Sequence, residues 1–208
     1  MRVEPVVLAG RFVRLEPLGL DHCAPLCEVG LDPDIWRWTT ADVRTPDAIR
    51  AYVAAALSDQ AAGRALPFAT IDAASGRAIG STRFGNVEPA HRRVEIGWTW
   101  IGREWQRTPV NTEAKYLLMR HAFETLGCVR VELKTDVLND RSRRAILRIG
   151  AKEEGILRKH AGLRRSCRPA AAARRLEPGG PHPDRSRSYR PRPAGLRPNR
   201  LRPAGLRR

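Results

Sequence analysis

The chain reads Trp105-Gln106-Arg107-Thr108-Pro109-Val110-Asn111-Thr112-Glu113-Ala114 where a strand pattern gives way to a helix pattern. Thr108 is the expected N-cap, and Pro109 takes the first helical position, where no N–H is needed. The first amides of a helix have no intrahelical partner, so such an end can bind a phosphate through its N–H groups and its dipole. Arg103 and Arg107 add positive charge beside it. A well-capped helix without a ligand explains the same residues, and this segment alone leaves both interpretations open.

Strand and helix patterns alternate on both sides of this segment. Stretches with alternating or β-rich residues predict strands at 12–16, 66–71, 78–87, 93–101, 129–135 and 151–157. Capped stretches predict helices at 21–30, 46–62, 109–126 and 140–149, with Asp21 and Thr45 as the first two caps and Gly127 and Gly150 closing the last two. Residues 35–38 form an aromatic connection. Hairpins followed by a strand–helix–strand–helix unit predict a mixed α/β (α+β) domain.

The net charge of +16 is unevenly distributed over the 208 residues. Residues 1–160 carry 24 Lys and Arg against 20 Asp and Glu, whereas residues 161–208 carry 14 Arg against 2 acids. The second segment also holds 8 of the 16 prolines and has no apolar periodicity, so we expect it to be a disordered Arg/Pro-rich tail. Because most of the charge lies outside the predicted domain, nucleic acid is not the expected partner.

The composition also bears on the compartment. A hydrophobic content of 42% suffices for a core, but no apolar run reaches the roughly 20 residues that cross a bilayer. The N-terminal apolar stretch is too short for a signal peptide. Cys23, Cys27, Cys128 and Cys167 lack zinc-ligand spacing and are expected to be free thiols. We therefore expect a cytoplasmic protein without a metal and without a membrane contact.

Three motifs, in this order, carry a resemblance to a known family: Glu95-Ile96-Gly97-Trp98, residues 106–114, and Asn139-x-x-Ser142 followed by Gly150-Ala151. With them, residues 8–160 resemble the GNAT superfamily of acyl-CoA-dependent N-acetyltransferases, and in particular its RimJ/RimL-type branch. The resemblance implies one GNAT-like domain over 1–160, with a mostly antiparallel sheet flanked by helices. It implies acetyl-CoA as co-substrate and direct acetyl transfer to a primary amine, on a protein N-terminus or a small molecule. A homodimer is compatible with it.

The resemblance also assigns the cofactor site. The family holds the pyrophosphate of coenzyme A with the backbone amides of Gln/Arg-x-x-Gly-x-Gly/Ala, a motif that falls on residues 106–111. Pro109 replaces the first glycine and removes one amide donor, and Asn111 replaces the last small residue. The implied cofactor-binding residues are Trp98, Arg103, Gln106, Arg107, Thr108, Val110, Asn111, Thr112, Asn139 and Ser142. A basic helix face would meet the 3′-phosphate of coenzyme A or be solvated; it consists of Arg141, Arg143, Arg144 and Arg148.

Glu95 and Ser142 are the implied catalytic residues. Glu95 would deprotonate the amine, or else form a structural salt bridge to an arginine. Strand alternation places it on one face with Gly97 and Thr99, and Trp98 on the opposite face. Ser142 would protonate the leaving thiolate, or else bond local backbone.

The remaining candidates lie around the acceptor. Trp36 and Trp38 fall where the family places its acceptor-groove loop, and they either line that groove or pack in the core. A strand amide near residues 98–100 would stabilise the developing oxyanion. His121 lies on the apolar side of its helix and is expected to pack there.

The resemblance stops at Lys159-His160, where family members continue with two more strands. The segment that follows is rich in Arg, Pro, Ala and Gly, as is a protein sequence translated out of frame from GC-rich DNA. A frameshift would therefore explain both the tail and the missing strands. Two other functions stay open at this point. One is a non-catalytic acyl-CoA-binding protein, and the other is a nucleic-acid-binding protein that uses the basic tail.

Overall fold

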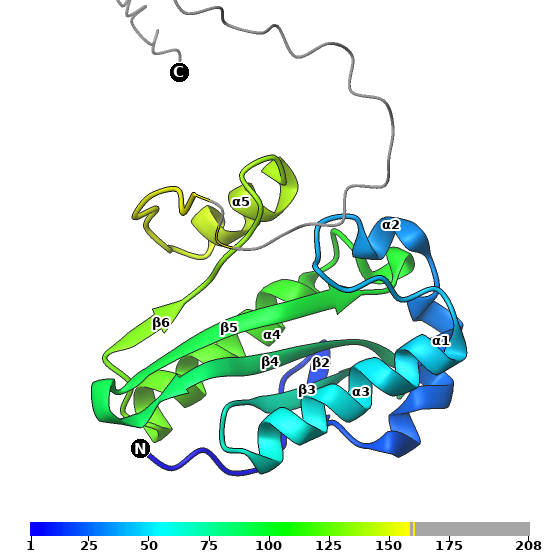
Figure 1. Ribbon diagram of the computed structural model, residues 1–208, viewed down its shortest axis with the longest axis horizontal. Coiled ribbons are helices and arrows are strands. Elements are labelled where there is room, and N and C mark those ends of the chain that lie inside the picture. Colours follow the sequence, from blue (N-terminus) through cyan, green and yellow to red (C-terminus); the bar gives the residue numbers. More distant parts are fainter. Residues whose placement is uncertain (159, 161–208) are drawn as a thin grey trace, which may run out of the picture. The chain divides into compact units, whose positions relative to one another are not determined.

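The computed structural model describes residues 1–158 and 160. In this part of the chain, six strands form one sheet in sequence order (Figure 1). Neighbouring strands pair antiparallel, except β5 and β6, which are parallel because α4 forms the crossover between them. The strands are β1 (Leu8–Ala9), β2 (Val13–Pro17), β3 (Leu66–Asp72), β4 (Ala78–Glu88), β5 (Arg93–Ile101) and β6 (Arg130–Glu132). The predicted mixed α/β fold with a mostly antiparallel sheet is confirmed.

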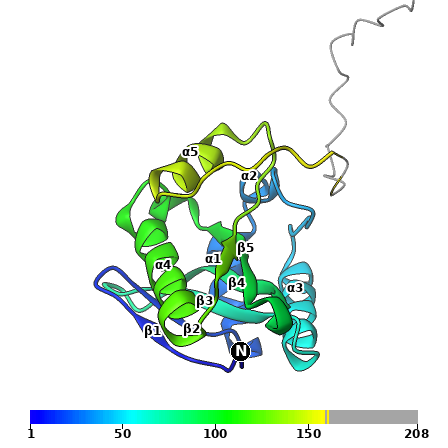
Figure 2. The same ribbon diagram turned by 90° about the vertical axis from the view of Figure 1, so that its left-hand side faces the viewer.

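Helices cover both faces of this sheet (Figure 2). One face carries α1 (Cys23–Gly30), α2 (Pro33–Trp36) and α3 (Pro46–Ala61), and the other carries α4 (Pro109–Arg120). The last described helix is α5 (Asp140–Arg148). As predicted, Thr45 caps α3 by accepting a hydrogen bond from the Ala48 amide. Gly127 and Gly150 adopt positive φ values of 64° and 92° after the last two helical segments.

Two hydrophobic clusters hold the helices against the sheet. The alternation of β3 separates them, because Phe68 points to the α4 side and Ala69 to the α3 side. On the α4 side, the core includes Phe68, Phe84, Val94, Ile96, Val110, Ala114, Leu117 and Leu118. On the α3 side, it includes Leu26, Trp36, Ile49, Val53, Ala69 and Trp100. This two-sided burial fixes which side chains of β5 reach each face.

A bulge in β5 changes that alternation. Ser81 pairs with Trp100 and Arg83 pairs with Gly97, so β5 contains one extra residue between these two pairs. Trp98 lies in the extra segment with a φ of 50°, which is unusual for a tryptophan. Its ring faces Arg83 on the α3 side, whereas Thr99 faces α4. The prediction that Trp98 lies opposite Glu95 and that Thr99 shares the Glu95 face was therefore wrong, because strict alternation does not survive a bulge.

Some predicted elements differ in extent. The helix expected after Asp21 begins at Cys23, with His22 at the N-cap, because residues Leu20–His22 form a 3-10 turn. The connection at 35–38 overlaps the short helix α2. The helix expected over 109–126 ends as α4 at Arg120 and continues as a π-helical turn, His121–Thr125.

The end of the described chain differs most. The strand predicted at 129–135 is reduced to β6, and residues 151–157 form no strand. Side-chain ion pairs hold that segment instead, from Arg130 to Glu154 and from Arg143 to Glu153. Without a further strand in the described residues, the outer edge of β6 has no ladder partner there. The predicted tail at 161–208, with its predicted disorder and frameshift, lies outside the described residues.

Three further observations apply to the described residues only. No helix among them is long and apolar enough to cross a membrane. They contain no cluster of His, Cys, Asp and Glu that could hold a metal ion. Cys23, Cys27 and Cys128 are free thiols, whereas Cys167 lies beyond the described part.

Candidate active site

The pairing between β5 and β6 stops after three residues of each strand. Arg93, Val94 and Glu95 pair with Arg130–Glu132, but β5 runs on to Ile101. Figure 1 shows the chain after β6 leading away from β5 toward α5. From Ile96 onward, the β6-facing edge of β5 has no strand partner in the described part of the chain. Such an edge can hold an extended ligand through backbone hydrogen bonds.

The N-terminus of α4 follows directly from this open edge. Thr108 is the N-cap: its hydroxyl donates to the Trp105 carbonyl at 2.7 Å and accepts from the Val110 amide at 3.4 Å. Pro109 occupies the first helical position, as predicted. Arg107 precedes the cap with a φ of 66° and an exposed side chain. This end therefore combines a helix N-terminus with a cation beside it, which suits an anionic ligand.

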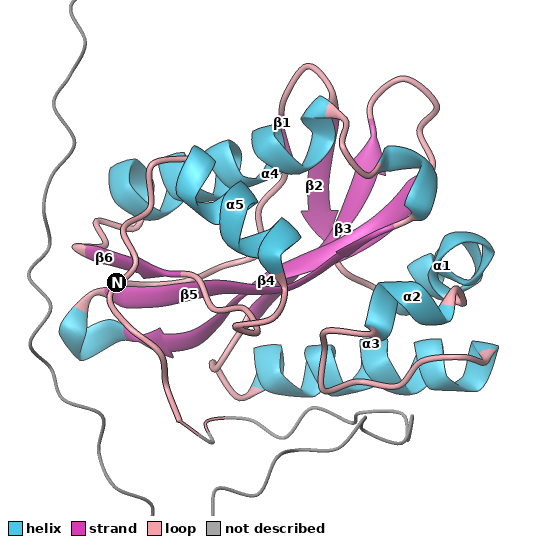
Figure 3. Cartoon of the chain, turned by 90° about the horizontal axis from the view of Figure 1, so that it is seen from above, coloured by secondary structure: helices cyan, strands magenta, loops and turns pink. Residues whose placement is uncertain are grey.

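Residues of α5 reach this helix end from the other side. Arg141 donates to the Gln106 side chain at 2.7 Å, and Arg148 donates to the Thr112 hydroxyl at 3.2 Å. Figure 3 shows α5 beside α4, as these contacts require. Gln106 also donates to the Ile101 carbonyl at 3.0 Å, so its side chain connects the end of β5 to α5. Two arginines of the predicted basic helix face thus flank the start of α4.

Arg103 is held elsewhere. Its guanidinium donates to Asp32 at 2.9 Å and to Asp34 at 2.8 Å, so it connects α2 to the end of β5. These carboxylates raise the pKa of Arg103, while the Asp34 amide and the Arg103 guanidinium lower the pKa of Asp32. Among the predicted cofactor-binding residues, Arg103 is therefore the one whose charge is already paired.

Two polar groups are buried where α4 faces the sheet. Asn111 has its Oδ1 buried with no partner among the described residues. Lys115, one turn further along, donates to the Thr99 hydroxyl at 2.6 Å, and Thr99 lies 2.8 Å from the Thr82 hydroxyl. Burial lowers the pKa of Lys115 to about 7, although the Glu95 charge opposes this shift. The orphaned Asn111 oxygen marks a place where a ligand N–H can bind.

Glu95 is buried on the α3 side of the sheet. Its Oε2 accepts from the Asn86 amide at 2.7 Å and from Lys134 at 2.8 Å. The sequence left two roles open for Glu95, that of a base and that of a partner in a salt bridge to an arginine. The structure contains a salt bridge, but its cation is Lys134. These two bonds hold the carboxylate in one position next to the bulge of β5.

The two predicted residues of α5 lie in its first turn. Asn139 is the N-cap, and its Oδ1 accepts from the Ser142 amide at 3.2 Å. The Ser142 side chain is half-buried, and its hydroxyl makes no hydrogen bond to another described residue. That hydroxyl is therefore available to a ligand.

The two predicted acceptor-groove tryptophans have different surroundings. Trp36 is buried, donates to the Gly30 carbonyl at 2.7 Å and packs against the Tyr52 and Trp100 rings. Trp38 is half-buried beneath the Arg37 guanidinium. Trp36 is thus a core residue, and Trp38 keeps an accessible side. His121 stacks on the Phe84 ring, in agreement with its predicted packing.

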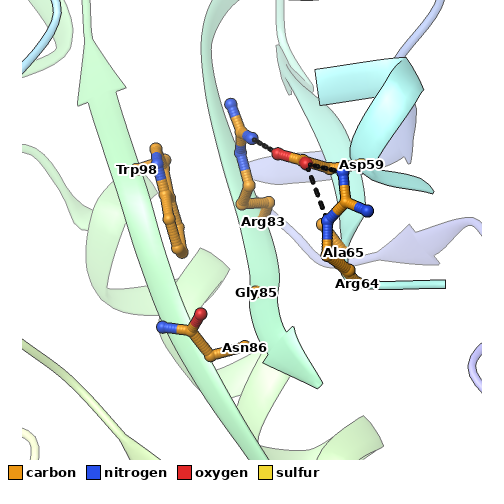
Figure 4. Close-up of a pocket in the computed structure, with 7 residues that line it drawn as sticks. All are labelled: Asp59, Arg64, Ala65, Arg83, Gly85, Asn86 and Trp98. Carbon is orange, nitrogen blue, oxygen red and sulfur yellow. Dashed lines mark hydrogen bonds and ion pairs between the residues drawn. The ribbon is translucent and has the colours of Figure 1, made fainter. Parts of the chain in front are cut away.

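A small cavity beneath Trp98 was not predicted. It has a volume of about 80 Å³ and is lined by Asp59, Arg64, Ala65, Arg83, Gly85, Asn86 and Trp98 (Figure 4). Tyr52 supports the bulge nearby by donating to the Trp98 carbonyl at 3.2 Å. Two basic residues missed from the sequence could have been found from its pattern. Arg83 lies in the middle of a strand, and Lys115 lies on the apolar side of its helix.

Comparison with known proteins gives a consistent result. A sequence model of the acetyltransferase (GNAT) domain matches residues 13–152, more than half of the chain. A Bacillus subtilis (strain 168) relative, "Putative ribosomal N-acetyltransferase YdaF", is 36% identical over 80 residues, which are 38% of this chain and 43% of the relative. The alignment thus spans less than half the length of this curated relative.

Solved structures extend the likeness over most of the described chain. A GCN5-related N-acetyltransferase from Brucella melitensis is 32% identical, with a TM-score of 0.70, over 78% of this chain and 74% of the other. An acetyl transferase from Salmonella typhimurium, which modifies the N-terminal serine of 50S ribosomal subunit protein L7/L12, has a TM-score of 0.67. The match covers 76% of this chain and 91% of that one at 18% identity, so it supports the fold alone.

Proposed function

The chain belongs to the GNAT family of acetyltransferases, and from this premise we propose that it transfers an acetyl group from acetyl-CoA to a primary amine. The observation that carries the proposal is the open edge of β5 beyond Glu95, which leads to the N-terminus of α4. An extended ligand with amide groups and a terminal phosphate fits a free strand edge followed by a cationic helix end. The strand edge and the helix end lie in the order that such a ligand needs.

The residues present suit coenzyme A. Backbone amides at Asn111 and Thr112 would face the pyrophosphate, whereas the Val110 amide already donates to the Thr108 hydroxyl. Arg107 and Arg148 would supply positive charge beside them. The buried Asn111 Oδ1 would accept an N–H from the pantetheine arm. Gln106 and Thr108 would keep this turn in place through the bonds described above. Arg103 would hold α2 in position and would not bind the cofactor directly, because its charge is already paired with Asp32 and Asp34.

Acetyl-CoA supplies an activated acyl thioester, and the chain supplies position and proton handling. A β5 backbone amide at the bulge near Trp98 would stabilise negative charge on the carbonyl oxygen. Glu95, fixed by Asn86 and Lys134, would take the proton of the attacking amine directly or through a water molecule. The Ser142 hydroxyl would donate to the departing thiolate. Holding amine and thioester together is worth up to about 7–11 kcal/mol of the barrier.

The acceptor is proposed at the level of its chemistry. The names of YdaF and of the Salmonella enzyme point to ribosomal proteins and, for the latter, to an N-terminal serine. We propose an α-amino group on a peptide or small molecule, entering from the α3 side where Glu95 and Trp98 lie. We propose the cytoplasm as the compartment of the protein, because a reducing environment keeps thiols such as Cys23, Cys27 and Cys128 free.

Acetyl-CoA turnover against amines and N-terminal peptides, followed by release of free thiol, tests the proposal. Arg107→Glu should raise the KM for acetyl-CoA at least tenfold, whereas Arg120→Glu, at the far end of α4, should leave it unchanged. Ser142→Ala should lower kcat more than it changes this KM. No thiol release with any acceptor, together with no thermal stabilisation by millimolar acetyl-CoA, would contradict the proposal.

Glu95→Gln tests the base separately. Because the acceptor amine is increasingly protonated as the pH falls, loss of the base should slow turnover most at low pH. A pH–rate profile parallel to that of the parent would exclude Glu95 as the base.

A further inference from the structure

Arg83 is a buried cation with few partners. It extends from β4 to the α3 side of the sheet, and its side chain is 5% exposed. Its NH1 reaches Asp59 Oδ2 at 3.5 Å, the limit of a hydrogen bond, and its Nε is buried without any partner among the described residues. A guanidinium carries five N–H donors and cannot be deprotonated in a protein. Because a buried charge is costly unless it is paired, a further anion near Arg83 would stabilise the protein.

Two aromatic rings hold this guanidinium in place. The Arg83 Cζ lies 5.0 Å from the centre of the Trp98 ring and 5.3 Å from that of Tyr52. Gly85 makes the Trp98 position possible, since a Cβ there would lie 2.2 Å from the ring. Figure 4 shows the Trp98 ring on one side of Arg83 and Asp59 on the other. The arginine is thus oriented before any ligand arrives.

The cavity beside Arg83 carries net positive charge. Among the described residues that line it, Asp59 is the only carboxylate. Two guanidiniums share this carboxylate, because Arg64 also donates to it at 2.8 and 3.2 Å. Glu95 next to it is already balanced by Lys134. A volume of about 80 Å³ exceeds by several times the roughly 10–15 Å³ that one water needs. It accommodates a carboxylate, whereas an ammonium group would meet two guanidiniums.

We propose that this cavity is a carboxylate subsite for the acceptor, formed by Arg83 and Arg64 beneath Trp98. The acceptor then carries a carboxylate close to its reacting amine. This inference rests on the proposed acetyl transfer for its meaning, because Trp98 lines the cavity and also lies in the bulge of β5. Two sources supply the same chemistry: the α-carboxylate of a free amino acid and the side chain of an acidic residue near a peptide N-terminus.

Matched acceptors distinguish these sources. One pair is glycine and glycinamide, and the other is a Ser-Glu peptide and the same peptide with Gln. We expect the carboxylate member of one pair to have a kcat/KM about tenfold higher, as for a hydrogen bond to a charged group. A preference in the first pair identifies a free amino acid, and one in the second identifies a peptide. Equal values within both pairs would overturn the subsite.

Variants with opposite expected signs separate binding from folding. Arg64 is exposed, so Arg64→Gln should fold and should weaken the preference several-fold. Asp59→Asn removes the competing carboxylate and should strengthen carboxylate binding. Arg83→Gln should abolish the preference, and Arg83→Lys should restore it only in part, since lysine lacks the planar fork. Changes of the same sign in Arg64→Gln and Asp59→Asn would indicate a merely structural role and overturn the proposal.

Direct binding keeps this test independent of catalysis. Free glutamate and the Ser-Glu peptide are titrated without acetyl-CoA, by calorimetry and by tryptophan fluorescence, with Trp98→Phe to identify the responding ring. Binding of either probe that weakens in Arg64→Gln supports the subsite even if no amine is acetylated, in which case only the proposed function fails. No binding of either probe, in a protein that turns over neutral amines, overturns the subsite alone.

Discussion

Among the described residues, each face of the sheet buries one basic side chain, and the two side chains are accommodated in different ways. On the α4 face, Lys115 contacts a hydroxyl, and its pKa falls to about 7, so it can enter the core as a neutral amine. On the α3 face, Arg83 cannot lose its proton and is held by Asp59 and two aromatic rings. A buried lysine can thus lose its charge and needs no ion partner, whereas a buried arginine stays charged and needs an anion nearby.

The largest expected effect concerns the pH dependence of stability set by Lys115. Its folded pKa of about 7 lies below the ordinary value near 10.4. Between these values the unfolded chain binds a proton that the folded chain does not, so stability falls as the pH falls from about 10 to about 7. The slope is at most about 1.4 kcal/mol per pH unit, or roughly 4 kcal/mol in all.

Lys115→Met should remove this slope. The free energy of unfolding of the variant should therefore rise relative to that of the parent as the pH falls. Urea unfolding at pH 7, 8, 9 and 10 measures the effect. Lys152→Met, at an exposed lysine, is the control and should follow the parent at every pH. Parallel curves for parent and Lys115→Met would mean that the buried amine stays charged.

A carboxylate on the α4 face provides the next effect. Glu113 accepts hydrogen bonds from the backbone amides of Arg11, Phe12 and Val13 at 2.9, 2.6 and 2.9 Å. Glu113→Ala leaves three donors without this acceptor and should lower the free energy of unfolding by about 3 kcal/mol. Glu113→Gln, which keeps one acceptor oxygen, should lose less.

Chemical denaturation measures both changes, with Glu124→Ala at an exposed position as the control. If Glu113→Ala unfolds at the same urea concentration as the control, water replaces the carboxylate as acceptor for the three backbone amides with no loss of stability.

The smallest effect concerns the anion of Arg83. Asp59→Asn should destabilise the protein by about 2 kcal/mol, because the buried guanidinium loses its partner. Asp42→Asn is a matched control, since Asp42 pairs with Arg44 at 2.6 Å on the exposed surface, where such a pair contributes about 0–1 kcal/mol. Thermal unfolding compares the two. An equal loss in both variants would show that Arg83 does not depend on Asp59.

Local sequence signals predicted much of this fold. The bounds of β5 and the caps Thr45 and Thr108 follow from alternation and from capping chemistry that involve only neighbouring residues. The bulge at Trp98 did not follow, because it depends on the register with β4. Residues 151–157 carry a strand pattern, but a strand also needs a partner, and none is present in the described residues.

The site was predictable only in its local parts. The helix end at Thr108 and the polar start of α5 were found because each is a short motif. The pairing of Arg103 with Asp32 joins residues 71 positions apart, and that of Arg83 with Asp59 joins residues 24 apart. No local pattern encodes such contacts, so only the three-dimensional structure shows that the Arg103 charge is paired and that a cavity lies beneath Trp98.

The contact between Glu113 and the loop after β1 also has a consequence for the order of folding. It closes chain separations of 100–102 residues, whereas β3, β4 and β5 are joined by short connections and can form early. During synthesis, the N-terminal strands emerge about a hundred residues before the helix that fastens them. We therefore expect β1 and the loop after it to be the last part of the sheet to become protected from hydrogen exchange in refolding.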